Sequence, residues 1–183
     1  NPQALGILLQ RATGQKYSTY LSDNLWKPLA EDDAYVILDS KKNRMPRMFC
    51  CLDATARDWL RIGLLILNKG KMGNHRVVSE QWINEMITPS DLNPNYGYLT
   101  WLGREHQENR MYNNKSTATA YHSEPFIDKD IIYLDGFGGQ RTYIIPSKNL
   151  VIVRTGSIRM SWDDSQLPNL ISKGISEDVK KTN

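Results

Sequence analysis

The sequence predicts an α+β fold in which helices come first, antiparallel strands follow, and a helix ends the chain. Two observations lead to this prediction. Apolar residues recur at helical spacing between residues 4 and 87. From residue 96 onward, short apolar runs alternate with turn residues, until helical spacing returns at 167–180. We therefore expect a helical part, residues 1–94, and a part with the sheet, residues 95–183, within one domain.

The first helix is expected over residues 4–12, because Leu5, Leu8 and Leu9 share one face and Gly14 follows as a C-terminal cap. A second helix begins near Tyr17, and Pro28 should end it. The mixed segment 31–48 then predicts a loop with one short strand near Tyr35–Leu38.

Two further helices complete the helical part. Asp53 or Thr55 should cap the third helix, and Gly70 should end it. Ser79 is a suitable N-cap for a fourth helix over residues 80–87.

The second part of the chain predicts strands. The polar segment 104–129 lacks periodicity and predicts a long loop at the rim of a site. Pro146 and Asn149 bound a four-residue turn that is typical of a β-hairpin. We expect strands at 96–102, 131–134, 140–145 and 150–155, and a C-terminal helix at 167–180 that carries Leu170, Ile171, Ile175 and Val179.

Composition excludes several classes of protein. The 183 residues are 40% hydrophobic and 23% charged, which is ordinary for a globular domain and argues against disorder or a coiled coil. The net charge of +3 comes without a cluster of basic residues, so a nucleic-acid partner is not expected. Arg61 and Gly63 interrupt the longest apolar run, so no membrane span is expected.

Cysteines and histidines give no metal or cofactor prediction. Cys50 and Cys51 are adjacent, and neighbouring cysteines rarely close a disulfide, so we expect two small half-buried residues at a helix entry. His75, His106 and His122 are far apart, and no Cys-x-x-Cys pair is present. We expect neither a metal nor a cofactor.

The chain contains no self-contained catalytic motif. It has no Gly-x-Ser-x-Gly, Walker, His-Glu-x-x-His or Gly-x-Gly-x-x-Gly pattern. The one unusual stretch is 135–140, with three glycines in four positions directly before a strand. It is either a turn or bulge that leads into the hairpin, or a backbone without side chains against which a substrate lies and N–H groups face an oxyanion. Spacing alone does not separate these two interpretations.

Five segments of the chain carry a resemblance to a known family. They are Asn1–Gly6 with Thr13-Gly14, Leu25–Leu29, Cys51–Asp58, Gly136–Gln140 and Ile145–Val153. Together they resemble the serine β-lactamase-like family, which includes class C β-lactamases, D-alanyl-D-alanine carboxypeptidases, esterases and 6-aminohexanoate-dimer hydrolases, and they follow the family's order through essentially the whole chain. The resemblance implies a partial β-lactamase/transpeptidase-like fold, with a helical subdomain before the antiparallel strands and the C-terminal helix.

The resemblance also implies where the catalytic groups belong. The family uses a Ser-x-x-Lys nucleophile and a Tyr-x-Asn element, and this chain contains no Ser-x-x-Lys. Because Asn1–Gly6 matches the family just after the tyrosine element, we expect the chain to be the C-terminal part of a longer hydrolase. Such a fragment, without the nucleophile, is expected to be inactive.

Only the third element of the family's site maps onto this chain. Phe137-Gly138-Gly139 takes the place of the Lys/His-Thr/Gly-Gly triplet, and the backbone N–H of Gln140 would be the strand-side donor of the oxyanion hole. Phe137 departs from the cationic residue that penicillin-recognising members use. An ester or amide with an apolar or neutral group therefore fits better than an anionic β-lactam.

The predicted loop 104–129 precedes this strand and would form the rim of the cleft. Its candidate substrate contacts are Tyr112, Tyr121, His122 and Glu124. The alternative is that all four are solvated loop residues. A role for His122 as a general base would need the missing serine beside it.

The sequence therefore predicts the C-terminal part of a serine hydrolase that acts on a small amide or ester through an acyl-enzyme. One alternative is a non-catalytic binding or interaction domain on the same scaffold, and another is an unrelated α+β domain whose glycines only make a turn. Truncation would expose a sheet edge, so self-association, or association with an N-terminal piece, is expected. Related enzymes are mostly exported, so the resemblance implies a periplasmic or exported location.

Overall fold

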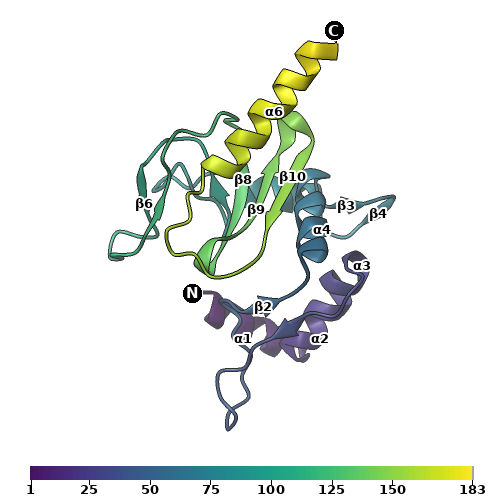
Figure 1. The fold of residues 1–183 in the computed structure, drawn as a ribbon. Coiled ribbons are helices and arrows are strands. Elements are labelled where there is room, and N and C mark those ends of the chain that lie inside the picture. Colours follow the sequence, from purple (N-terminus) through teal and green to yellow (C-terminus); the bar gives the residue numbers. More distant parts are fainter. Residues whose placement is uncertain (183) are drawn as a thin grey trace.

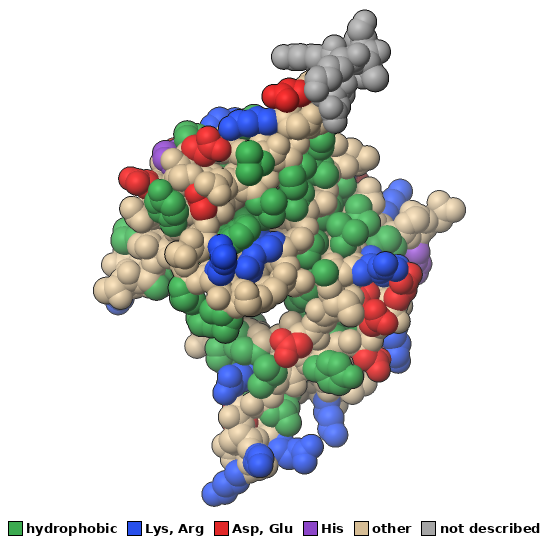
Figure 2. Space-filling model, viewed as in Figure 1, with side chains coloured by type: hydrophobic (Ala, Val, Ile, Leu, Met, Phe, Trp, Pro, Cys, Tyr) green, Lys and Arg blue, Asp and Glu red, His purple; other side chains and the backbone are tan. Residues whose placement is uncertain are grey.

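The computed structural model describes the backbone of residues 1–182 and the side chains of residues 1–177. Figure 1 shows two halves, with the N-terminal helices below and a sheet with the C-terminal helix above. Figure 2 shows an open gap between these halves, with hydrophobic side chains beside it. Among the described residues, no helix is long and apolar enough to cross a membrane.

The N-terminal helices follow the prediction except at Pro28. Helix α1 (Pro2–Thr13) is capped by Asn1 at its start and by Gly14, whose φ is 68°, at its end. Helix α2 (Tyr17–Leu21) continues through a π-helical turn, η1 (Ser22–Trp26), into α3 (Lys27–Leu29). The prediction that Pro28 ends this helix is wrong. The wider π turn, in which the Lys27 N–H donates to Ser22 O, lets the chain take in Pro28 at the start of the next helical turn.

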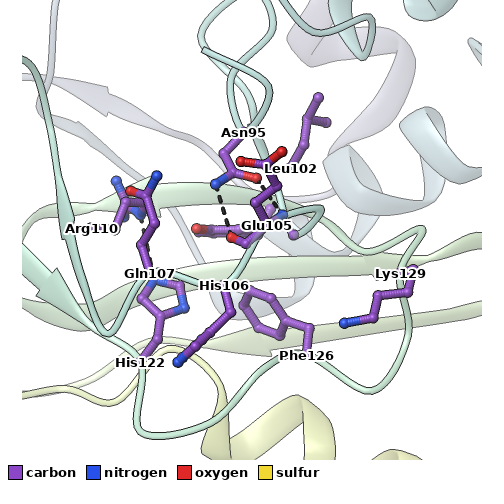
Figure 3. A pocket seen from close by; sticks show the side chains of 11 residues that line it. Asn95, Leu102, Glu105, His106, Gln107, Arg110, His122, Phe126 and Lys129 are labelled. Atoms are coloured by element: carbon purple, nitrogen blue, oxygen red, sulfur yellow. Dashed lines mark hydrogen bonds between the residues drawn. The ribbon is translucent and has the colours of Figure 1, made fainter.

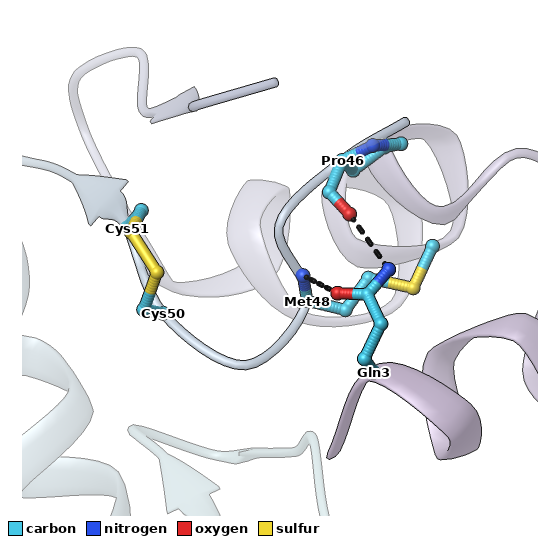
Figure 4. The surroundings of a disulfide bond; sticks show 5 residues. All are labelled: Gln3, Pro46, Met48, Cys50 and Cys51. Atoms are coloured by element: carbon cyan, nitrogen blue, oxygen red, sulfur yellow. Dashed lines mark hydrogen bonds between the residues drawn. A yellow bond between two sulfur atoms is a disulfide. The ribbon is translucent and has the colours of Figure 1, made fainter. Parts of the chain in front are cut away.

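A short strand pair and a loop link α3 to the next helix. The predicted strand near Tyr35 is β1 (Tyr35–Val36), which pairs antiparallel with β2 (Leu52–Asp53). The loop between these strands is fastened to α1, because the Gln3 side chain donates to Pro46 O and accepts from the Met48 N–H (Figure 4).

The two cysteines lie in this loop and form a disulfide (Figure 4). The expectation that Cys50 and Cys51 stay unpaired is therefore wrong. Cys51 adopts φ 71°, and this left-handed backbone at the second cysteine accompanies the pairing. Both residues precede β2 rather than a helix entry.

Helices α4 and α5 confirm their predicted caps. The Thr55 hydroxyl accepts from the Asp58 N–H at the start of α4 (Ala56–Leu67), and the Ser79 hydroxyl accepts from the Trp82 N–H at the start of α5 (Glu80–Met86). Between them lies a small hairpin, β3 (Lys71–Met72) and β4 (His75–Arg76).

The main sheet is antiparallel, with strand order β10-β9-β8-β5. The hairpin of β9 (Gln140–Ile145) and β10 (Leu150–Arg154) is confirmed, with Asn149 left-handed in its turn. Strand β8 (Ile132–Gly136) pairs with β9, and Gly136 lies opposite Gln140. Strand β10 has no partner on its outer edge among the described strands.

The predicted strand over 96–102 is too long, because only β5 (Trp101–Leu102) joins the sheet. The preceding residues turn back, with the Gly97 N–H donating to Thr100 O and Leu99 at φ 55°. The prediction of an irregular loop over 104–129 is also wrong in part. The loop contains a further hairpin, β6 (Asn109–Met111) and β7 (Thr119–Tyr121), which buries Arg110 and Ala120 on one face.

Alternating strand residues build one core on each face of the sheet. Tyr133, Tyr143 and Ile145 face α6 (Gln166–Thr182), where Leu167 and Ile171 pack against them. The predicted C-terminal helix is thus confirmed, with Leu170 and Ile175 exposed and the Val179 side chain outside the described residues. On the other face, buried residues of α4, α5 and the strands pack together, namely Ile66, Ile83, Leu102, Ile132 and Ile144. The helical part, 1–94, thus contributes α4 and α5 to the sheet of the second part.

Candidate functional site

The glycine-rich stretch is a tight turn at one end of the sheet. A 3-10 turn, η2 (Phe137–Gly139), joins β8 to β9, and the backbone of Gly138 is left-handed, with φ 70° and ψ 28°. Gly139 also has a positive φ, 82°. The Phe137 side chain is 74% exposed. The turn therefore presents an apolar ring to solvent beside a stretch of bare backbone.

Both turn glycines also lie against the segment that precedes α6. A Cβ atom on Gly138 would lie 2.8 Å from Ile158 Cγ2, and one on Gly139 would lie 2.8 Å from Trp162 Cβ. The Arg159 N–H donates to Gly138 O at 2.8 Å. Positive φ and close approach thus both require glycine at these positions. The turn interpretation is sufficient to explain why these two residues are glycine.

Gln140, the residue after the turn, uses its side chain to hold the same segment. Its amide donates to Gly156 O and accepts from the Gly156 N–H, each at 2.9 Å. The Arg154 guanidinium donates to Gly139 O at 2.8 Å and stacks on Trp162, with Cζ 4.5 Å from the ring centroid. These contacts join the turn and the segment 156–162 into one surface.

A cluster of buried charges lies beneath the turn, and we call Arg110, Asp135, Arg141 and Asp164 the ionic cluster. Arg141 pairs with Asp135 at 2.8 Å and with Asp164 at 2.7 Å. Its Nη1 also donates to Gly136 O and Gln140 O, at 2.7 and 2.8 Å. Arg141 thus fixes the two carbonyl groups that bracket the turn.

Arg110 attaches the β6–β7 hairpin to this cluster. Its Nη2 donates to Asp135 and Asp164. The guanidinium carbon lies 3.5 Å from the centre of the Trp101 ring and 4.9 Å from that of Tyr112, so two aromatic rings lie beside the cation. Such a buried charge is tolerated because it is both paired and hydrogen-bonded.

Burial and charge perturb the pKa values of this region. Burial alone would lower the pKa of Arg141, but the carboxylates of Asp164 and Asp135 raise it above its ordinary value. Burial raises the pKa of Asp164, and Arg141 opposes that shift. Burial, and then the nearby charge of Arg110, lower the pKa of His122 to about 4. His122 is therefore neutral near pH 7.

The four candidate rim residues do not come together in one cleft. The Tyr112 hydroxyl lies 3.3 Å from Asp135 Oδ1 at the end of β8, and Tyr121 is 40% exposed on β7. His122 is buried, where the Arg110 Nε donates to it at 3.4 Å and Phe126 meets it edge-on. Glu124 accepts from Asn169 of α6 at 2.9 Å. Of the four, Tyr112 contacts the strand that enters the turn, whereas His122 and Glu124 fasten the loop. Substrate contact by any of them stays a prediction.

A small cavity lies beside His122 and Arg110, as Figure 3 shows. Its volume is about 10 Å³, which is the space of one water molecule. Gln107, Phe126 and Lys129 also line it. Arg110 Nη1 has no hydrogen-bond partner among the described residues. The cavity is too small for an organic substrate.

Sequence reasoning did not find the ionic cluster. A signal was present, because Asp135 directly follows one apolar strand run and Arg141 comes just before the next, both at positions that face the α6 side of the sheet. A charge at such a position needs a partner of opposite sign. Among the described residues, no group of three or more His, Cys, Asp or Glu side chains could hold a metal ion.

Comparison with known proteins assigns this arrangement to a fold. No protein-family model matches the chain. A 6-aminohexanoate-dimer hydrolase of Paenarthrobacter ureafaciens is 32% identical over 88 residues, which are 48% of this chain and 22% of that protein. The structure of a "putative 6-aminohexanoate-dimer hydrolase" of Bacillus anthracis matches 98% of this chain and 42% of its own, with 19% identity and a TM-score of 0.67.

The serine β-lactamase-like resemblance is confirmed. A second structure, a "putative beta-lactamase" of Bacteroides dorei, matches 94% of this chain and 54% of its own, with 14% identity and a TM-score of 0.58. At such identities the two structures show the fold, which is β-lactamase-like. The chain spans about half the length of these structures or less, and about a fifth of the curated relative.

Proposed function

We propose that this chain supplies the C-terminal part of a β-lactamase-related serine hydrolase that cleaves an amide or ester through an acyl-enzyme. The observation that carries the proposal is the match of nearly the whole chain to 42% of a β-lactamase-like structure, together with sequence similarity to a curated hydrolase. The 183 residues contain no Ser-x-x-Lys. The nucleophile would therefore come from residues outside this sequence.

In this proposal the turn and the start of β9 form one wall of the active site. The serine oxygen would attack the substrate carbonyl carbon, and the Gln140 N–H would donate to the oxygen that becomes negative. The amine or alcohol would leave with a proton, and water would then release the acid and regenerate the serine. Support comes from the bare backbone at Gly138 and Gly139 and from Arg141, which fixes the turn from below.

The proposed substrate is uncharged where it meets this wall. Phe137 places an exposed apolar ring where penicillin-recognising relatives have a cation. The guanidinium of Arg154 is close, but it is bound to the carbonyl oxygens of Gly139 and Ser157. A neutral ester or amide is therefore favoured over an anionic β-lactam.

The test compares the printed 183-residue chain with the same chain preceded by its upstream coding sequence. We expect the extended protein to contain Ser-x-x-Lys and Tyr-x-Asn, to hydrolyse a nitrophenyl ester, and to act poorly on nitrocefin. The 183-residue chain alone should be inactive. Loss of either motif upstream would favour a non-catalytic binding domain. Equal activity of the two proteins would contradict the proposal, because the nucleophile would then lie within the 183 residues.

The unpaired edge of β10 supports a second part of this proposal, that the chain associates with itself or with the N-terminal piece. The edge strand, Leu150–Arg154, has three consecutive apolar residues after Leu150. Their side chains alternate between the two faces of the sheet. Light scattering should therefore give a mass above that of one chain. A mass of one chain, with cooperative unfolding, would contradict association.

A further inference from the structure

We propose that Phe137, Ile158 and Met160 form a subsite for an uncharged alkyl or aryl chain of the substrate; this inference rests on the proposed function and adds a substrate class to it. We call these three residues the apolar platform. Their side chains are 74%, 64% and 71% exposed, respectively. Large exposed apolar side chains next to a candidate site are typical of a binding surface.

The platform belongs to a built surface rather than to a free loop. Phe137 precedes Gly138, which lies directly against Ile158 and accepts a hydrogen bond from the Arg159 N–H. The Gln140 side chain holds Gly156 by two hydrogen bonds, and Arg154 donates to Ser157 O at 3.1 Å. The segment that carries Ile158 and Met160 is therefore fixed to the turn at several points. Such pre-organisation lowers the entropic cost of binding.

The position of the platform determines which part of the substrate it would contact. Phe137 and Ile158 flank the same turn whose next residue, Gln140, is the proposed oxyanion donor. An acyl or leaving group bound at Gln140 would thus extend its chain over the platform. The platform would make the rate depend on the length of an apolar chain.

Most charged side chains near the platform are already bound to other groups of the chain. Arg154 is bound to backbone oxygens and stacked on Trp162, and Asp135 is buried in the ionic cluster. Arg159 lies between the two platform residues of its segment, and its side chain has no ion-pair or hydrogen-bond partner among the described residues. It therefore offers a matched control, since it tests charge on the same segment without changing the apolar surface.

The experiment is an NMR titration of the 15N-labelled 183-residue chain. The probes are N-alkyl acetamides from butyl to octyl, and a second series in which the chain ends in a carboxylate. We expect the amide signals of Gly138, Gly139, Gln140 and Ile158 to shift, and binding to tighten by up to about fourfold for each added CH₂. In Arg159→Gln, which lacks the uncommitted guanidinium of this segment, the carboxylated series should bind more weakly than the neutral series, because its charge would lie on an apolar surface.

The variants separate the platform from its surroundings. The double variant Ile158→Ser with Met160→Ser should lose the dependence on chain length, whereas Arg159→Gln should keep it. Binding without length dependence in the unmodified chain, or tighter binding of the carboxylated series by Arg159→Gln, would overturn the proposal. So would concentration-dependent shifts of the platform signals without ligand, because they would place a second copy there.

The ester assay of the extended protein tests the proposed function independently. If no ester is hydrolysed but length dependence persists, the proposed function fails and the apolar subsite stands. If esters are hydrolysed at a rate independent of chain length, the proposed function stands and the apolar subsite fails.

Discussion

Arg141 and Asp135 form a buried ion pair, 2.8 Å from Nη1 to Oδ1, beneath the turn between β8 and β9. The same Nη1 donates to Gly136 O and Gln140 O, so one guanidinium connects the carboxylate to the backbone on both sides of the turn. Asp164 holds the Nε of Arg141 at 2.7 Å. The shape of the candidate active-site wall thus depends on a pair of charges that is almost completely buried.

Removal of the Arg141 charge should strongly destabilise the chain. In Arg141→Gln, Asp135 and Asp164 would remain buried with only Arg110 to compensate them, and breaking a buried pair costs about 3–5 kcal/mol. The free energy of unfolding, measured with urea, should fall by that amount. Arg159→Gln is the control, since an exposed unpaired charge should change it by less than about 0.5 kcal/mol. A cost below about 1 kcal/mol for Arg141→Gln would contradict the cluster's role.

The turn glycine should be more sensitive to alanine than a glycine of the same backbone conformation elsewhere. Gly138 and Gly14 have φ of 70° and 68°, so each alanine variant pays a left-handed penalty of about 1 kcal/mol. A Cβ meets nothing within 4 Å at Gly14, but would lie 2.8 Å from Ile158 at Gly138. We expect Gly138→Ala to cost about 1–2 kcal/mol more than Gly14→Ala in thermal or urea unfolding. Equal costs would mean that the Ile158 contact relaxes freely.

Short-range sequence patterns predicted the caps and turns that depend only on nearby residues. The caps Thr55 and Ser79, the left-handed Gly14 and the hairpin turn at Asn149 depend on residues within a few positions, and all four are confirmed. The helix through Pro28 was missed, because a π turn changes the hydrogen-bond register without a clear sequence signature.

The candidate site was harder to predict, because its contacts join distant parts of the chain. The position of the turn was predictable from its glycines, but the segment that packs against it, 156–162, lies well downstream. Because its residues are polar, solvent exposure was one interpretation of the loop 104–129. Arg110 is nevertheless buried, since the neighbouring Tyr112 surrounds it together with Trp101 and the carboxylates of Asp135 and Asp164, which come from three other segments. No spacing rule relates these positions.

The disulfide between Cys50 and Cys51 predicts a specific thiol count. Without reductant, the unfolded chain should show no free thiol, and after reduction it should show two. Because the two residues are adjacent, the closed loop is minimal and its effect on chain entropy is small. The double variant Cys50→Ser with Cys51→Ser should therefore change the free energy of unfolding by less than about 1 kcal/mol. Two free thiols before reduction would contradict the pairing.

His122 should make the chain less stable in mild acid. Burial and Arg110 lower its pKa to about 4 in the folded chain, against 6.5 for the ordinary side chain. The unfolded state therefore binds the extra proton between these two values, so stability falls as the pH drops from about 6.5 to 4. The total loss is on the order of 3 kcal/mol. Asp164, whose pKa is raised, acts in the opposite direction and requires a comparison between variants.

The comparison uses His122→Gln, which retains an acceptor for the Arg110 Nε but does not titrate. Urea unfolding at pH 7 and at pH 4.5 should show a smaller loss of stability in the variant than in the unmodified chain. The groups that face His122 from neighbouring segments, Asp163, Asp164, Arg110, Arg141 and His106, are the same in both proteins, so their contributions largely cancel. Parallel pH profiles would contradict the prediction. They would mean that the imidazole, although it is only 5% exposed, gains a proton as easily as one in water.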